Sequence, residues 1–181
     1  NNCTAMEHTT YRSKKGVCTM AVDFSKSKTR ENLMRAFAGE SQARNRYTFA
    51  AQLAMENNLY VIKEVFDLTA KQETEHAEVF YRFLKEIEGM EVVINGAGYP
   101  VNTSQNVEQL LADAMHNETQ ESDDIYREFG DVALEEGFNH IAGKFYMIAE
   151  IEKSHAKRFE QFYEWMRDGK LFIQEEKAGW M

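Results

Sequence analysis

Proline is nearly absent from this sequence: Pro100 is the only one in 181 residues. Because proline interrupts helices and cannot donate a backbone hydrogen bond inside a sheet, a chain with so few prolines is free to be helical over most of its length. Long apolar runs are also missing, and none approaches the about 20 residues that a membrane-spanning helix needs. We therefore expect a helical, water-soluble domain with no membrane span.

Basic residues are also fewer than acidic residues. The chain has 21 Lys and Arg residues against 30 Asp and Glu, which gives a formal net charge of −9. Nucleic acids are bound by a basic face, and anionic membrane surfaces attract basic segments. This charge balance argues against a nucleic-acid partner and against attachment to a membrane.

Cysteine occurs only at Cys3 and Cys18. This spacing is neither a CxxC metal site nor a disulfide framework, and it favours free thiols in a reducing compartment, the cytoplasm, over a single disulfide. The apolar stretch 16–22 is too short and too broken for a signal peptide. We interpret residues 1–22 as an N-terminal extension of unclear role. It is open whether they precede a start at Met20, remain from cloning or form a presequence.

Apolar residues recur at helical spacing in four long segments, about 29–58, 59–87, 106–136 and 138–167. Residues 89–105 hold three glycines and the only proline, so they predict a long connection between the second and third helices. Two helical hairpins joined by one long crossover describe an all-α, ferritin-like four-helix bundle. We assign this bundle to residues 23–172, and residues 173–181 to a C-terminal tail or linker.

The two halves of the chain repeat each other. A shift of 79 residues places Phe66 on Phe145 and superimposes the segments 73–83 and 152–162, and a shift of 78 places Glu40 on Glu118. Such self-similarity is typical of a duplicated structural unit, here a helical hairpin. Both core-forming residues and residues able to carry chemistry recur in this way.

The repeated polar residues have the spacing of metal ligands. Helical residues at i and i+3 share a face, so the Glu73–His76 and Glu152–His155 pairs can each hold a metal or bridge two. Glutamates on the other two helices complete the set known from di-iron and di-manganese bundles. Carboxylates and imidazoles suit iron, and also manganese or zinc. The six residues of this predicted dinuclear site are Glu40, Glu73, His76, Glu118, Glu152 and His155.

One isolated Glu-x-x-His is usually a solvated helix face, so the metal-site interpretation depends on two copies occurring in register. We place the neighbouring Glu75 and Glu78 on the solvent side. The repeat is broken at Glu121, three residues after Glu118, where the first half has Ala43. Glu121 is either a surface glutamate or a seventh ligand that makes the two metal positions inequivalent.

Two tyrosines follow the predicted ligands within about two helical turns. Tyr47 lies seven residues after Glu40, and Tyr126 lies five residues after Glu121. Each could hydrogen-bond a carboxylate or donate protons and electrons, and each could equally be a core tyrosine bonded to the backbone. His116 and His140 have no repeated partner, and we predict that they lie at the surface.

At these residues the chain resembles the rubrerythrin family. The resemblance covers about residues 20–172 and is carried by 31–34 with 37–40, 73–77 and 152–156. It implies a non-haem centre of two iron ions held by the six residues above and Glu121, with Glu73 and Glu152 bridging. It also implies that Glu121 and His76 alternate as ligands of one iron, and that Tyr47 and Tyr126 act beside the centre.

The family resemblance also implies an activity: a peroxidase that reduces hydrogen peroxide to water in oxidative-stress defence, as a homodimer. Family members commonly continue into a rubredoxin-like domain with paired CxxC motifs, and this sequence ends at Met181 without one. It is a naturally short member, a truncated chain or part of a longer protein. In the first two cases an external donor such as rubredoxin supplies the electrons.

Three other functions fit parts of the pattern. A ferroxidase or iron-storage protein would react slowly with peroxide and form a large shelled assembly. A manganese catalase would contain manganese and release oxygen. In a metal-free structural bundle the glutamates would be surface charges, and Glu73→Ala or Glu152→Ala would barely change the metal content.

Overall fold

The computed structural model describes residues 22–172, and all regular structure in that range is helical. The residues of the predicted N-terminal extension up to 21, both cysteines and the predicted tail 173–181 lie outside the described range. The helices are α1 (Lys28–Glu56), α2 (Tyr60–Phe83), α3 (Val107–Gln120), α4 (Tyr126–Glu135) and α5 (Asn139–Arg167). Short turns of 3-10 helix, η1 (Phe24–Lys26) and η2 (Leu84–Ile87), and the π-helical turn η3 (Glu121–Ile125) complete the list.

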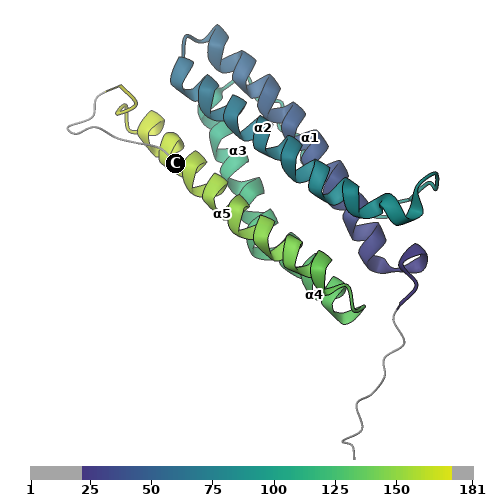
Figure 1. Cartoon of the computed structure of the whole chain (residues 1–181). Coiled ribbons are helices and arrows are strands. Elements are labelled where there is room, and N and C mark those ends of the chain that lie inside the picture. The colour runs from purple at the N-terminus through teal and green to yellow at the C-terminus, as the bar shows by residue number, and fades with distance from the viewer. Residues whose placement is uncertain (1–21, 173–181) are drawn as a thin grey trace, which may run out of the picture.

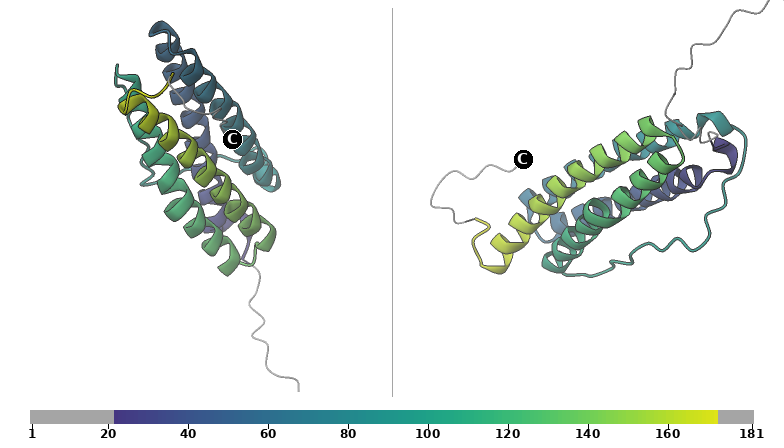
Figure 2. Two further views of the ribbon diagram at one scale, coloured as in Figure 1. Left: turned by 90° about the vertical axis from the view of Figure 1, so that its left-hand side faces the viewer. Right: turned by 90° about the horizontal axis from the view of Figure 1, so that it is seen from below.

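The helices form two antiparallel hairpins that lie side by side (Figure 1). The first hairpin is α1 with α2, and the second is the α3–η3–α4 rod with α5. Residues 88–106 contain no helix and run back along the outside of the bundle, from the end of α2 to the start of α3 (Figure 2, right). The predicted four-helix bundle with one long crossover is confirmed. No helix among residues 22–172 has the length and apolar character to cross a membrane.

The tight turns of the two hairpins are built alike. Asn58 and Gly137, which are equivalent in the repeat, both adopt positive φ, 61° and 89°. In each turn the next residue donates its backbone N–H to a carbonyl five residues earlier, Leu59 to Ala54 at 2.9 Å and Phe138 to Ala133 at 2.8 Å. This is the hydrogen bond of a Schellman helix end. The duplication therefore extends to the connections between helices.

Two apolar clusters fill the bundle, one on each side of a polar layer. The first gathers around Phe66 and Phe159, and the second around Phe80 and Phe145. On α5 the second cluster ends at Ala149 and the first begins at Phe159, so the chain between them crosses the polar layer. The same order holds on α1, and the order is reversed on α2, which runs antiparallel to α1. Packing on both sides thus holds the polar layer at a fixed depth in the bundle.

Two of the predicted helices are not continuous. The second ends as α2 at Phe83 and continues as the 3-10 turn η2, and the third is interrupted by η3. The cause of the second interruption is one extra residue: Tyr126 follows Glu118 by eight positions, whereas Tyr47 follows Glu40 by seven. A single π-helical turn absorbs such an insertion and returns the chain to register. The change of the repeat shift from 78 to 79 is the sequence signal of this turn.

Candidate metal centre

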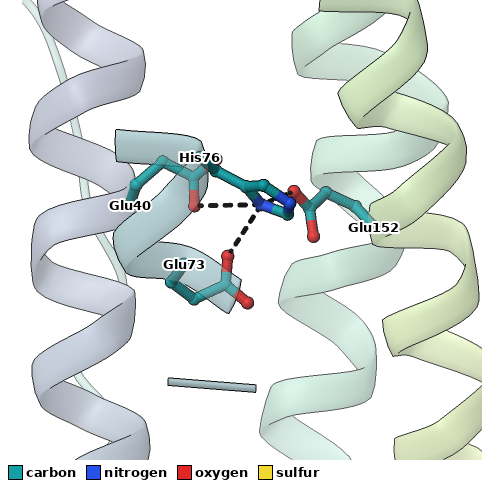
Figure 3. A group of neighbouring side chains, drawn as sticks. All are labelled: Glu40, Glu73, His76 and Glu152. Carbon is teal, nitrogen blue, oxygen red and sulfur yellow. Dashed lines mark hydrogen bonds and ion pairs between the residues drawn. The ribbon is translucent and has the colours of Figure 1, made fainter. Parts of the chain in front are cut away.

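The polar layer contains two groups of potential metal ligands. Glu40, Glu73, His76 and Glu152 form one, and Glu73, Glu118, Glu152 and His155 form the other; within each group the ligand atoms lie within 4.8 Å of one another. Figure 3 shows the first group, with side chains from α1, α2 and α5 converging between the helices. The two groups share Glu73 and Glu152.

Each shared glutamate presents one oxygen to each group. In Glu152, Oε1 lies 2.7 Å from His76 Nδ1 and Oε2 lies 2.7 Å from His155 Nδ1. In Glu73, Oε2 lies 3.3 Å from His76 Nδ1 and Oε1 lies 3.1 Å from His155 Nδ1. The two imidazole rings are 5.6 Å apart and inclined by only 16°. A carboxylate with one oxygen on each side is arranged to bridge two cations.

The two unshared glutamates are each held by a tyrosine from the other hairpin. Tyr126 donates its hydroxyl to Glu40 Oε1 at 2.5 Å, and Tyr47 donates to Glu118 Oε1 through a short hydrogen bond. Both tyrosines thus bond carboxylates rather than backbone carbonyls. These paired bonds connect α1 to α4 and to α3 across the centre. They fix one oxygen of each glutamate and leave the other, Glu40 Oε2 and Glu118 Oε2, without a hydrogen bond.

The burial of these groups fits a metal centre. The four glutamates and His155 are fully buried, and His76 is 6% exposed. Besides the oxygens just named, Glu73 Oε1, both Glu152 oxygens and both ring nitrogens of His155 make no hydrogen bond. Buried charges without compensation are strongly destabilising. Two divalent cations among these atoms would supply that compensation, and oxygen with imidazole donors suits iron, manganese or zinc.

The electrostatics show how closely the groups interact. Burial, with the nearby Glu152 and Glu73, raises the pKa of Glu40 well above its usual range. Burial alone would lower the pKa of His76, but the carboxylates of Glu152 at 2.7 Å and Glu73 at 3.3 Å raise it to about 10. In the same way contacts with Glu118, Glu152 and Glu73 raise the pKa of His155 to about 12. Without metal, therefore, protons hold this centre together, and bound cations would replace them.

Glu121 lies outside both groups. It begins η3, is half-buried, and lines a cavity of about 530 Å³ together with Tyr126. Burial and the neighbouring Glu118 raise its pKa well above the usual range. Its role as a seventh ligand remains a prediction. The neighbours placed on the solvent side, Glu75 and Glu78, are exposed as predicted, and so are His116 and His140.

A buried arginine beside the centre was not predicted from the sequence. Arg158, three residues after His155, is 7% exposed and donates to Gln72 Oε1 at 2.9 Å and to Thr69 Oγ1 at 3.2 Å. Burial lowers the pKa of Arg158, while the charges of Glu118 and Glu73 act against that effect. Its i+3 spacing from His155 was the available signal, since that spacing places it near the ligand face.

Comparisons with known proteins agree with this description. A family model described as rubrerythrin matches residues 31–163 and 109–178. The chain is 41% identical to rubrerythrin-1 of Clostridium acetobutylicum, over 85% of this chain and 79% of the relative. It is 36% identical to rubrerythrin of Nitratidesulfovibrio vulgaris, over 85% of this chain and 78% of the relative.

Among solved structures, partially reduced nigerythrin superimposes with a TM-score of 0.68 at 28% identity, over 88% of this chain and 81% of that chain. The fold of this chain is therefore found in a relative whose redox states have been resolved. The family model matches most of the chain, the relatives are similar over most of both chains, and the buried Glu and His groups suit a di-iron centre. This chain therefore belongs to the rubrerythrin family.

Proposed function

We propose that this chain is a non-haem di-iron peroxidase that reduces hydrogen peroxide to water in oxidative-stress defence. The ligands in this proposal are Glu40, Glu73, His76, Glu118, Glu121, Glu152 and His155. The observation that carries it is the pair of carboxylates shared by both groups, Glu73 and Glu152, each with one oxygen toward each histidine. Two adjacent iron ions would supply the two electrons that peroxide reduction requires and would polarise its O–O bond.

The protein's own groups would manage the protons. Reduction of one peroxide to two waters takes up two protons, so a proton donor close to the reacting oxygens is needed. Tyr126 suits this role, because its hydroxyl donates a hydrogen bond to Glu40 and its side chain lines the cavity together with Glu121. Burial and Glu40 raise the pKa of Tyr126, so the phenol keeps its proton at neutral pH.

Charge balance supports a redox role for the same residues. Five carboxylates, those of Glu121 and the four buried glutamates, would face a charge of +4 from two ferrous ions and +6 from two ferric ions. The near-neutral total in both states keeps the buried centre from accumulating charge during turnover. Electrons for re-reduction would come from an external donor such as rubredoxin, and the homodimer belongs to the same proposal.

Metal analysis followed by stopped-flow kinetics tests the proposal. Natively isolated protein should contain close to two irons per chain. After anaerobic reduction, one equivalent of hydrogen peroxide should oxidise the centre faster than oxygen does. Faster oxidation by oxygen would favour ferroxidase chemistry, and the absence of stoichiometric metal after reconstitution would overturn the metal centre itself.

A further inference from the structure

A cavity lies beneath the crossover, on the side of the bundle where Tyr126 bonds Glu40. Its volume is about 530 Å³, and its walls come from α1, α3, η3, α4 and crossover residues 96–100. The outer wall includes the exposed Gly98, whereas the inner wall includes Tyr126 and Ala36, each 2% exposed. Tyr126 bonds Glu40 directly, so the buried end of the cavity lies one side chain from a predicted ligand.

The crossover is fastened over this cavity. Tyr99 donates its hydroxyl to the backbone carbonyl of Arg35 on α1 at 3.0 Å. Farther along, Asn102 Oδ1 accepts hydrogen bonds from Arg46 on α1 at 3.0 Å and from Asn117 on α3 at 2.9 Å. The segment is therefore bonded to helices of both hairpins, on either side of the seam that the cavity occupies.

The ring of Tyr99 covers the helix surface next to a ligand. A Cβ added at Gly39 would lie 3.7 Å from Tyr99 Cε1, which is ordinary van der Waals contact, and Gly39 directly precedes Glu40. Tyr99 is 38% exposed, so its side chain is partly buried against α1 and partly open to solvent. Removal of the ring would widen the opening without disturbing either ligand group.

We propose that this cavity is the route by which peroxide reaches the metal centre, and that Tyr99 sets the size of the peroxide that passes. This inference rests on the proposed function. The lining is partly polar, with Glu121 at the inner end and Gln42 Nε2 free of any hydrogen bond. The polar groups can bond a small polar molecule such as hydrogen peroxide, and the restriction on larger peroxides is the size of the opening beside Tyr99.

A second hollow provides the matched control. It has a volume of about 400 Å³, lies on the α1–α2 face and also touches one ligand, Glu73. However, its lining lacks both tyrosines that bond the carboxylates, and both Glu73 oxygens are directed at the histidines. An aromatic side chain at Asn45, an exposed residue of this hollow, should obstruct it and leave the route under the crossover open.

The experiment compares iron-loaded variants with equal metal content. Tyr99→Ala opens the route, Tyr99→Phe keeps the ring, and Gly98→Phe adds bulk where a Cβ meets nothing within 4 Å. The readouts are the ratio of kcat/KM for tert-butyl hydroperoxide to that for hydrogen peroxide, and the association rate of azide with the oxidised centre. Azide binding reports access to iron even in a protein that reduces no peroxide.

We expect Tyr99→Ala to raise the tert-butyl hydroperoxide ratio about tenfold, the effect of relieving a steric restriction of one small group. Tyr99→Phe should change the ratio little. Gly98→Phe should slow azide association, and Asn45→Phe should leave it unchanged. The proposal is wrong if the ratio and the azide rate are the same in all four variants, or if Asn45→Phe alone slows azide. If no variant reduces peroxide but Gly98→Phe still slows azide association and Asn45→Phe does not, the proposed function is wrong and the cavity is still the route to the metal centre.

Discussion

The two hairpins carry the same parts, but only the second contains a π-helical turn. Glu40 and Tyr47 lie on the unbroken α1, whereas their counterparts Glu118 and Tyr126 flank the π-helical turn η3. Each tyrosine still reaches the carboxylate of the opposite hairpin. One inserted residue can therefore be absorbed without loss of the tyrosine–glutamate hydrogen bonds, because a π-helical turn restores the helical register of the residues that follow it.

The two tyrosines make equivalent hydrogen bonds but lie in different surroundings. Tyr47 packs between Phe66 and Phe159 inside the first apolar cluster, with ring centroids 5.9 and 5.2 Å away. Tyr126 also packs on aromatic rings but in addition lines the cavity beneath the crossover. Position 43 shows the same contrast, since Ala43 is buried in the first cluster whereas its counterpart Glu121 faces the cavity. The first half is therefore closed, with Tyr47 and Ala43 packed in an apolar cluster, and the second half is open, with Tyr126 and Glu121 lining the cavity.

Removal of a carboxylate shared by both groups should have the largest effect. Glu73→Ala and Glu152→Ala should each abolish stoichiometric binding of both metals, because each side chain serves both groups. The equivalence of the hairpins predicts the same loss for either variant. Metal content after reconstitution measures it, with the exposed Glu75→Ala as the control that should keep its metal. Retention of one metal in either variant would show that the two glutamates do not bridge.

Metal binding should release protons and strengthen as the pH rises. In the metal-free protein the pKa of His76 is about 10 and that of His155 about 12, so both carry protons at pH 7. Metals bind the neutral imidazole, and each proton displaced makes the affinity about tenfold tighter per pH unit while the pH is below those pKa values. Calorimetry in buffers of different ionisation enthalpy counts the protons. Binding that is independent of pH between 6 and 8 would contradict the protonated histidines.

Substitutions at Ala43 and at its counterpart Glu121 test whether the first half is closed and the second half is open. In metal-free protein, Ala43→Glu should cost about 3 kcal/mol of unfolding free energy, because it buries a charge in an apolar cluster. Glu121→Ala should cost less than about 1 kcal/mol or be stabilising, since it removes a carboxylate whose surroundings disfavour its charge. Urea unfolding measures both. Equal costs for the two substitutions would remove the distinction between the halves.

Removal of a tyrosine hydroxyl should have a modest effect on stability. Tyr47→Phe and Tyr126→Phe each delete one hydrogen bond to a buried carboxylate and should each cost about 1–2 kcal/mol. Oxidation of the reduced centre by peroxide should slow only in Tyr126→Phe, because only this tyrosine lines the cavity. Stopped-flow absorbance of iron-loaded variants measures the rate. A similar slowing in Tyr47→Phe would show that both tyrosines support the centre in the same way.

Much of the fold and most of the candidate site were predictable from the sequence. Helical periodicity and a nearly proline-free chain predicted the helices, and the glycine-rich segment 89–105 predicted the crossover. The repeated Glu-x-x-His pairs predicted which residues the two groups contain, because i and i+3 spacing is a local property of a helix. Whether Glu121 joins them could not be predicted, since its position depends on the geometry of the π-helical turn.

The sequence by itself determined the helices, their pairing and the residues that face one another at the centre. Only the packing of the hairpins shows that Glu73 and Glu152 each turn one oxygen to each histidine and that the tyrosines bond the opposite hairpin's carboxylates. It also decided that Arg158 is buried and that Tyr99 lies over Gly39. The physical reason is that periodicity fixes the face of a helix, whereas these contacts join segments far apart in the chain and depend on how the hairpins pack.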